Sequence, residues 1–292
     1  MNEGVHMQTA RERAMRAARI KAGHMKFRAH QILATHAIPI YRRVRSIDTP
    51  LADRYLFVLA HPRSGSTMVS HVLQTHPDII GFGEHHEGYE TQSDLEALAT
   101  RNAFFDRSPA TTRRYTMDKI VWNHHELSDT VLHDPATRFV FLAREPEATL
   151  ESYRRMFTDM TTDERRCDSY EHRLTGMIDL AERIGDASRM RFVTYENLTQ
   201  RTEPTLAELT DFLELEVPLS ENYDLNSKSG SQSWGDPSEH IKAGKIISVD
   251  REGSAIDGDV LARANEVYRH SCDRLTVLAS AAPTPAIGPE SR

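Results

Sequence analysis

The chain has 292 residues, of which 39% are hydrophobic, and its formal net charge is −7. This length and composition suffice for one large α/β domain with a buried core, and the acidic balance disfavours a nucleic-acid-binding protein. The two cysteines and the lack of an apolar run near 18 residues disfavour a disulfide framework and a transmembrane helix, and they favour the cytoplasm.

The first 50 residues differ in charge from the rest. Up to Arg45, ten lysines and arginines stand against only Glu3 and Glu12, and residues 11–28 predict a basic helix. Such a helix either packs on the main domain with a solvated face or contacts an anionic membrane surface or a partner. We therefore predict a basic helical extension over 1–50, one main domain over 51–280, and a disordered, proline-containing tail over 281–292.

Beyond residue 51, strand patterns alternate with helical patterns. Short apolar runs predict strands at 55–60, 79–82, 115–122, 138–143 and 189–194. Helical spacing predicts helices at 68–76, 94–101, 146–159, 163–185, 205–213 and 256–279. This alternation predicts a parallel sheet of about five strands with helices on both faces. Ligands bind beyond the carboxyl ends of such strands, so the residues directly after each strand are the candidate site.

The loop after the first predicted strand combines small, hydroxyl-bearing and basic residues. It reads His61-Pro62-Arg63-Ser64-Gly65-Ser66-Thr67. The helix start that follows offers free N–H groups and a positive dipole end, which suit a phosphate group. The alternative is an ordinary Ser/Gly turn that caps a helix. The loop lacks the GxxxxGK[ST] pattern of nucleotide triphosphatases, so we expect phosphate binding of a different type.

Arg144 directly follows the fourth predicted strand, and Ser152 lies two turns into the next helix. An arginine at the end of a buried strand is at the depth where ligands bind in α/β sheets. The alternative is a surface arginine that pairs with Glu145 or Glu147.

Together these features resemble the PAPS-dependent sulfotransferase family of bacterial type, where PAPS is 3′-phosphoadenosine-5′-phosphosulfate. Pro62 to Thr67 is similar to that family's 5′-phosphosulfate loop, and Arg144 with Ser152 is similar to its 3′-phosphate pair. Two further loops match, and they read Tyr195-Glu196-Asn197-Leu198 on the adenine side and Trp234-Gly235-Asp236-Pro237 near the C-terminus. The resemblance covers about residues 55–250 and implies a P-loop NTPase-like fold, no metal, and a sulfotransferase domain over 51–280.

The resemblance also implies roles for the donor-binding residues. Arg63 would contact the bridging oxygen and the sulfate through its permanent charge. Residues 64–67 would hold the 5′-phosphate, Arg144 and Ser152 the 3′-phosphate, and Tyr195 the adenine. Further cationic candidates in the C-terminal loop are His240, Lys242 and Lys245.

The acceptor hydroxyl must lose a proton, and a carboxylate or histidine within hydrogen-bond reach serves this best. By resemblance to members that share the PRSG loop, Glu84 is the expected base, with His85 and His86 as alternatives. Lys119 lies in a predicted buried strand, so it should pair with Asp118 or another acid, or point at the ligand. By the same resemblance it stabilises the departing sulfate, and Asn123 is a weaker candidate for that pocket.

The predicted function is therefore transfer of the sulfuryl group of PAPS to a hydroxyl-bearing acceptor, with a carbohydrate or small molecule favoured. The products would be the sulfated acceptor and adenosine 3′,5′-bisphosphate. Two alternatives stay open: a P-loop kinase acting on a small molecule, and a nucleotide-binding adaptor without catalysis that is anchored through residues 1–50.

Overall fold

The computed structural model describes residues 40, 52–81, 83–106, 113–157, 159–225, 241–247 and 255–280. The predicted basic extension lies outside these residues apart from Ile40, and so does the predicted tail. The Trp234 to Pro237 loop and His240 also lie outside them.

The described residues form a five-stranded parallel sheet in the order β2-β3-β1-β4-β5. Its strands are β1 (Ala52–Ala60), β2 (Ile79–Gly81), β3 (Arg113–Ile120), β4 (Thr137–Ala143) and β5 (Met190–Thr194). The predicted α/β class and the parallel sheet of five strands are confirmed. β1 is the central strand, with Val58 opposite Lys119 of β3 on one side and Val140 of β4 on the other.

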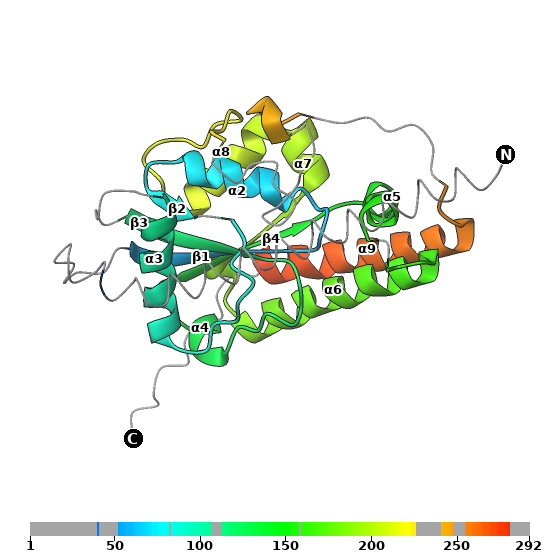
Figure 1. The fold of residues 1–292 in the computed structure, drawn as a ribbon, viewed down its shortest axis with the longest axis horizontal. Coiled ribbons are helices and arrows are strands. Elements are labelled where there is room, and N and C mark those ends of the chain that lie inside the picture. The colour runs from blue at the N-terminus through cyan, green and yellow to red at the C-terminus, as the bar shows by residue number, and fades with distance from the viewer. Residues whose placement is uncertain are drawn as a thin grey trace, which may run out of the picture.

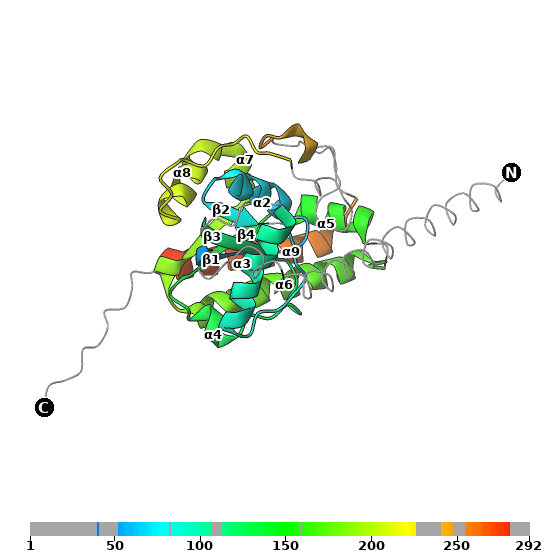
Figure 2. The same ribbon diagram turned by 60° about the vertical axis from the view of Figure 1, so that its left-hand side comes forward.

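Helices cover both faces of the sheet (Figure 1). They are α2 (Ser66–Thr75), α3 (Gln92–Asp106), α4 (Asp129–Leu132), α5 (Pro146–Met156), α6 (Asp163–Ile184), α7 (Tyr195–Gln200), α8 (Thr202–Phe212) and α9 (Gly258–Ser280). Figure 2 shows α2, α7 and α8 on one face and α6 with α9 on the other. Within the described ranges, no helix combines the length and the apolar character needed to cross a bilayer.

Alternate residues of β1 divide the core between the two faces. Phe57 and Leu59 are fully buried in the cluster that contains the buried faces of α6 and α9. Leu56 and Val58 are fully buried in the cluster that contains α2 and α8. Each such side chain contributes about 1.5–3 kcal/mol through burial. A strand buried on both faces reads as a continuous apolar run, which explains why the sequence pattern located β1.

Capping residues in the sequence determine where the helices α5 and α6 begin and where α6 ends. Pro146 occupies the first turn of α5, and the side chain of Glu145 accepts a hydrogen bond from Ala148 N. Thr162 caps the start of α6, and Gly185, with a φ of 62°, ends it.

Two helices were not predicted from the sequence, and one is longer than predicted. The four residues of α4 are too few to show a helical period, although Ser128 caps them. Residues 195–198 were predicted as a loop, but they begin α7, which the side chain of Thr194 caps. Helix α3 extends well beyond the predicted 94–101 at its C-terminal end.

Candidate active site

The loop between β1 and α2 has the backbone geometry of a close-fitting turn. Arg63 and Gly65 have positive φ angles of 67° and 88°. A Cβ atom at Gly65 would lie 2.5 Å from Cδ2 of Tyr195. Glycine suits this position for two reasons, because it adopts the left-handed backbone without strain and because it leaves room for the Tyr195 ring. Within the described part of the chain, no side chain caps the start of α2. A helix start without a side-chain cap is the arrangement that commonly binds an anion through its first N–H groups.

The fold brings the predicted donor-binding residues together from distant parts of the chain. Arg63 Nε donates a hydrogen bond to Ser152 Oγ at 2.8 Å. Arg144 Nη1 donates to the carbonyl oxygen of Arg63 at 3.4 Å. The guanidinium carbon of Arg144 lies 3.9 Å from the ring centroid of Tyr195, so the cation stacks on the aromatic face. Arg144 and Ser152 are both buried.

Two buried polar atoms in this cluster lack a hydrogen-bond partner among the described residues. They are Ser64 Oγ and Arg144 Nε. A buried polar atom without a partner costs about 1–3 kcal/mol, so native structures keep few of them. Both atoms can donate a hydrogen bond, and both lie in the segments that the sequence assigns to phosphate binding. These two hydrogen-bond donors, one in each segment, therefore fit a nucleotide with phosphate groups at two positions.

His61, at the end of β1, links the loop to Arg144. Its Nδ1 lies 2.8 Å from the carbonyl oxygen of Pro62, and its Nε2 accepts a hydrogen bond from Arg144 N at 3.0 Å. The ring is fully buried, and its edge packs against Tyr170 with 4.9 Å between ring centroids. Burial lowers the pKa of His61 to about 3. The neutral ring therefore links the loop after β1 to the segment after β4.

We expect His61 to make the fold sensitive to acid. The unfolded chain protonates this residue near pH 6.5, whereas the native state resists protonation until about pH 3. Its stabilising contribution is therefore complete above pH 6.5 and is lost progressively as the pH falls from 6.5 to about 3, with a slope of at most ~1.4 kcal/mol per pH unit. Urea unfolding of the wild type and His61→Gln between pH 7.5 and 4.5 measures this contribution.

In that comparison the wild type should lose unfolding free energy faster than His61→Gln as the pH falls. Other buried groups also titrate in this range, because burial lowers the pKa of His85 to about 4 and raises that of Asp118 to about 6. These contributions are common to both proteins and cancel in the difference. Equal slopes would show that His61 is not the group responsible.

Glu84 and Lys119 form a buried pair on the other side of the loop. Lys119 Nζ lies 3.4 Å from Glu84 Oε2 and 3.4 Å from Thr67 Oγ1. The exposed fractions of Glu84 and Lys119 are 7% and 3%, so the carboxylate is not a solvated loop residue. The ammonium group therefore connects the candidate base to Thr67, at the start of α2.

The two histidines after Glu84 have different surroundings. His85 is buried, and its Nε2 lies 2.8 Å from Oδ1 of Asn102 in α3. His86 has a positive φ of 54°, and its Nδ1 lies 3.1 Å from Glu84 Oε1. Of the two alternatives to Glu84, His86 thus has a ring nitrogen beside the candidate carboxylate, whereas the His85 ring contacts Asn102.

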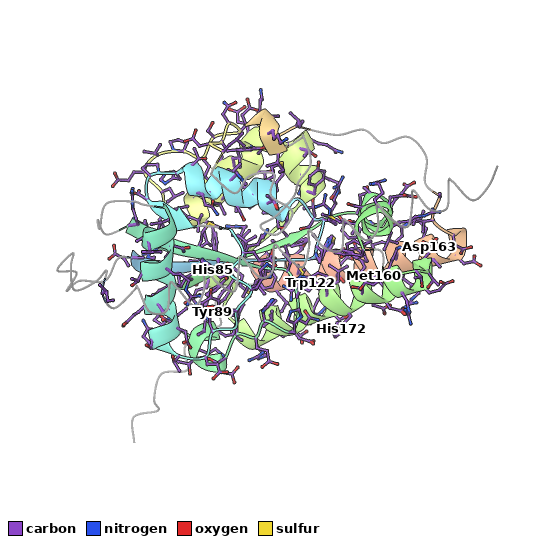
Figure 3. The ribbon with its side chains drawn as sticks, in the orientation of Figure 1. His85, Tyr89, Trp122, Met160, Asp163 and His172 are labelled. Atoms are coloured by element: carbon purple, nitrogen blue, oxygen red, sulfur yellow. The ribbon has the colours of Figure 1, made fainter. Side chains whose placement is uncertain are left out.

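Asp118 of β3 holds the segment after β2 through hydrogen bonds. Its carboxylate accepts hydrogen bonds from the N–H groups of Lys119 and His85 at 2.7 and 3.1 Å, and from the Tyr89 hydroxyl at 2.7 Å. His85 and Tyr89 are labelled in Figure 3. The sequence left Asp118 as one partner for the Lys119 ammonium. In the structure Asp118 instead binds the backbone, and the ammonium pairs with Glu84.

Arg173 of α6 is a buried cation that the sequence analysis missed. Its three nitrogens donate to the carbonyl oxygens of Ala60 and Ile120 and to Asn123 Oδ1, at 2.8, 2.7 and 2.6 Å. It therefore fixes the carboxyl ends of β1 and β3. Asn123 Nδ2 in turn donates to the carbonyl oxygen of His172, so this amide is held by α6. The only sequence signal was an arginine on the apolar face of a helix.

A chain of ring contacts extends from His86, the neighbour of Glu84, to Phe157. Trp122 packs edge-on against Phe157 with 5.8 Å between centroids and stacks on His124 at 6.2 Å. His125 lies 4.1 Å from His124 and 5.7 Å from His86, again between centroids. Trp122 and His172 are labelled in Figure 3.

The two predicted lysines of the C-terminal loop lie in the described segment 241–247. Lys245 pairs with Glu221 at 2.9 Å, and Lys242 is exposed in a short 3-10 helix, Ile241–Ala243. Their roles stay predictions. Among the residues that the structure describes, no group of three or more His, Cys, Asp or Glu side chains is arranged to hold a metal ion.

Comparisons of this chain with known proteins find matches to sulfotransferases. A family model described as "Sulfotransferase family" matches residues 56–219. Mouse sulfotransferase SULT7A1 complexed with PAP matches with a TM-score of 0.45 and 16% identity, over 80% of this chain and 88% of that one. The sulfotransferase domain of the Synechococcus PCC 7002 olefin synthase matches with a TM-score of 0.45 and 20% identity, over 75% and 96%. No curated protein matches the sequence.

Proposed function

The chain belongs to the sulfotransferase family, and on that premise we propose that it transfers the sulfuryl group of PAPS to a hydroxyl group of a carbohydrate or small molecule. The observation that carries the proposal is the meeting of Arg63, Ser152 and Arg144 around one loop, through contacts of 2.8 and 3.4 Å. A donor with phosphate groups at two positions accounts for both arginines and for the unpartnered atoms of Ser64 and Arg144.

In the proposed reaction, Glu84 takes the proton of the acceptor hydroxyl as the hydroxyl oxygen bonds to sulfur. The bond between sulfur and the bridging oxygen breaks, and adenosine 3′,5′-bisphosphate leaves with the bonding electrons. Arg63 and Lys119 would balance the charge that develops on the departing oxygen and on the sulfuryl group. The Lys119 contacts to Glu84 and Thr67 support this assignment, because they put one cation between the base and the loop.

The rings beside Glu84 support a small polar acceptor. Trp122 and Phe157 offer apolar faces, and His86, His124 and His125 offer nearby polar edges. Binding sites for small molecules commonly combine apolar walls with a few polar groups in this way. The two free cysteines fit a reducing compartment such as the cytoplasm.

Thermal stabilisation by nucleotides tests the donor. Adenosine 3′,5′-bisphosphate should raise the melting temperature, whereas 5′-AMP and ATP with magnesium should raise it little. At 100 times its dissociation constant a ligand adds about 2.7 kcal/mol of stability. The assay is then repeated with PAPS and a panel of sugar and alcohol acceptors, with release of the bisphosphate as the readout.

Two results would contradict the proposal. Stabilisation by ATP with magnesium but not by the bisphosphate would indicate a small-molecule kinase. Tight binding of PAPS without turnover on any acceptor would indicate a nucleotide-binding adaptor.

A further inference from the structure

The proposed reaction releases one proton in every turnover, and this proton has to leave Glu84 before the next turnover. Sulfuryl transfer replaces the hydrogen of the acceptor hydroxyl, and the base takes that hydrogen as a proton. A protonated carboxyl group cannot act as a base again until its proton has reached water. The route from Glu84 to solvent is therefore part of the catalytic cycle.

The surroundings of Glu84 restrict this route. Glu84 is 7% exposed, and its Oε1 atom is fully covered and has no hydrogen-bond partner among the described residues. Its Oε2 atom lies 3.4 Å from Lys119 Nζ, but an ammonium group has no lone pair that could take a proton. The ring of His85 is buried, and its Nε2 lies 2.8 Å from Asn102 Oδ1. Neither Lys119 nor His85 thus connects the Glu84 carboxylate with solvent.

His86 lies between the covered oxygen and solvent. Its Nδ1 lies 3.1 Å from Glu84 Oε1, and its side chain is 35% exposed. This distance is within hydrogen-bond reach, and catalytic hydrogen bonds often become well aligned only when the substrate is bound. Imidazole is the side chain that both takes and releases protons near neutral pH. A single ring therefore lies beside the buried base and also meets water.

The backbone holds His86 in this place. Its φ angle is 54°, in the left-handed region that is unfavourable for residues with a Cβ atom. The segment is anchored on both sides, because the Asp118 carboxylate accepts hydrogen bonds from the N–H group of His85 and from the Tyr89 hydroxyl. Unfavourable backbone conformations of this kind persist where the surroundings fix them, and they cluster at active sites.

We propose that His86 carries the proton of each turnover from Glu84 to water. This inference rests on the proposed function and on Glu84 as its base. The O–H bond of the protonated Glu84 breaks, and the proton forms a bond to the lone pair of His86 Nδ1, after a half-turn of the carboxyl group where Oε2 received it. The imidazolium then releases its Nε2 proton to water, and tautomer exchange in water restores the ring. His86 acts through Glu84 and does not touch the substrate.

The test is His86→Asn, measured in two kinetic regimes. Asparagine tolerates the left-handed backbone and keeps a polar group near Glu84, but its amide cannot carry a proton. With substrates in excess, kcat should fall about 10²-fold, the low end of what a positioned proton-transfer group contributes. With enzyme in excess over PAPS, each Glu84 works once and needs no proton exit, so the single-turnover rate should stay within about threefold of the wild type.

Added imidazole gives a second readout. Free imidazole can occupy the space of the missing ring and carry the proton, so it should raise the kcat of His86→Asn with a saturating concentration dependence. The matched control is His270→Asn, which removes an exposed imidazole from α9 and should keep wild-type kcat with or without added imidazole. Stabilisation by adenosine 3′,5′-bisphosphate should be equal in all three proteins.

Three outcomes would overturn the inference. The first is a kcat of His86→Asn within twofold of the wild type. The second is a single-turnover rate that falls as far as kcat, which would assign His86 to holding Glu84 or to the role of base. The third is a low kcat that imidazole does not raise. Failure of the proposed function is seen separately, because the wild type would then gain no stability from the bisphosphate and would not turn over PAPS.

Discussion

Glu84→Gln should lower kcat by about 10²- to 10⁴-fold, the range that a positioned general base contributes. The amide keeps the size of the side chain but cannot take a proton from the acceptor. Glu84 is buried and its Oε2 lies 3.4 Å from Lys119 Nζ, so its carboxylate is held in a fixed position. The measurement is kcat at saturating PAPS and acceptor, from a coupled assay of bisphosphate release.

Two controls accompany this variant. Glu90→Gln removes the same charge from an exposed side chain of the same segment, and it should keep wild-type kcat. Stabilisation of Glu84→Gln by adenosine 3′,5′-bisphosphate shows that the donor site is intact. A kcat of Glu84→Gln near that of the wild type would remove Glu84 from the role of base and leave His86, whose Nδ1 lies 3.1 Å from Glu84 Oε1, as the next candidate.

Arg144→Ala should weaken binding of adenosine 3′,5′-bisphosphate by about 2–5 kcal/mol, or roughly thirtyfold to a few thousandfold. Arg144 is buried, its Nε has no partner in the described residues, and its guanidinium stacks on Tyr195. Removing it leaves a buried phosphate without its forked cation. Isothermal titration of the bisphosphate, with 5′-AMP in parallel, gives the loss.

The loss should be specific for the 3′-phosphate. The affinity for 5′-AMP, which lacks that group, should change much less than the affinity for the bisphosphate. Arg165→Ala removes an exposed arginine of α6 and should bind the bisphosphate like the wild type. An equal loss for both nucleotides would indicate that Arg144 supports the fold of the loop through its contact with the Arg63 carbonyl oxygen and does not read the 3′-phosphate.

The strands β1 and β4 were predictable because they are buried on both faces along most of their length. A strand of this kind is apolar at every position, so the runs at 55–60 and 138–143 stand out from the flanking loops. Parallel strands also place their carboxyl ends at one edge, which assigns Arg63 and Arg144 to the same candidate site. Their contact at 3.4 Å agrees with that expectation.

The partners of buried polar groups were not predictable in the same way. Whether the Lys119 ammonium meets Asp118 or Glu84 depends on how the segment after β2 lies over β3, and no local pattern encodes that choice. Arg173 shows the same limit, because its partners come from strands more than 50 residues away in the chain. The site roles of Glu84, Lys119 and the donor-binding residues stay predictions until the variants are measured.

The central position of β1 also governs how the chain is made. β1 is synthesised first among the strands, yet its two neighbours in the sheet, β3 and β4, begin at Arg113 and Thr137. At roughly 5–20 residues per second, about 4–15 s separate the synthesis of Ala60 from that of Thr137. Throughout that interval the nascent chain carries an apolar strand with an unpaired edge. Aggregation and chaperone binding therefore concern the growing chain on the ribosome more than the finished enzyme.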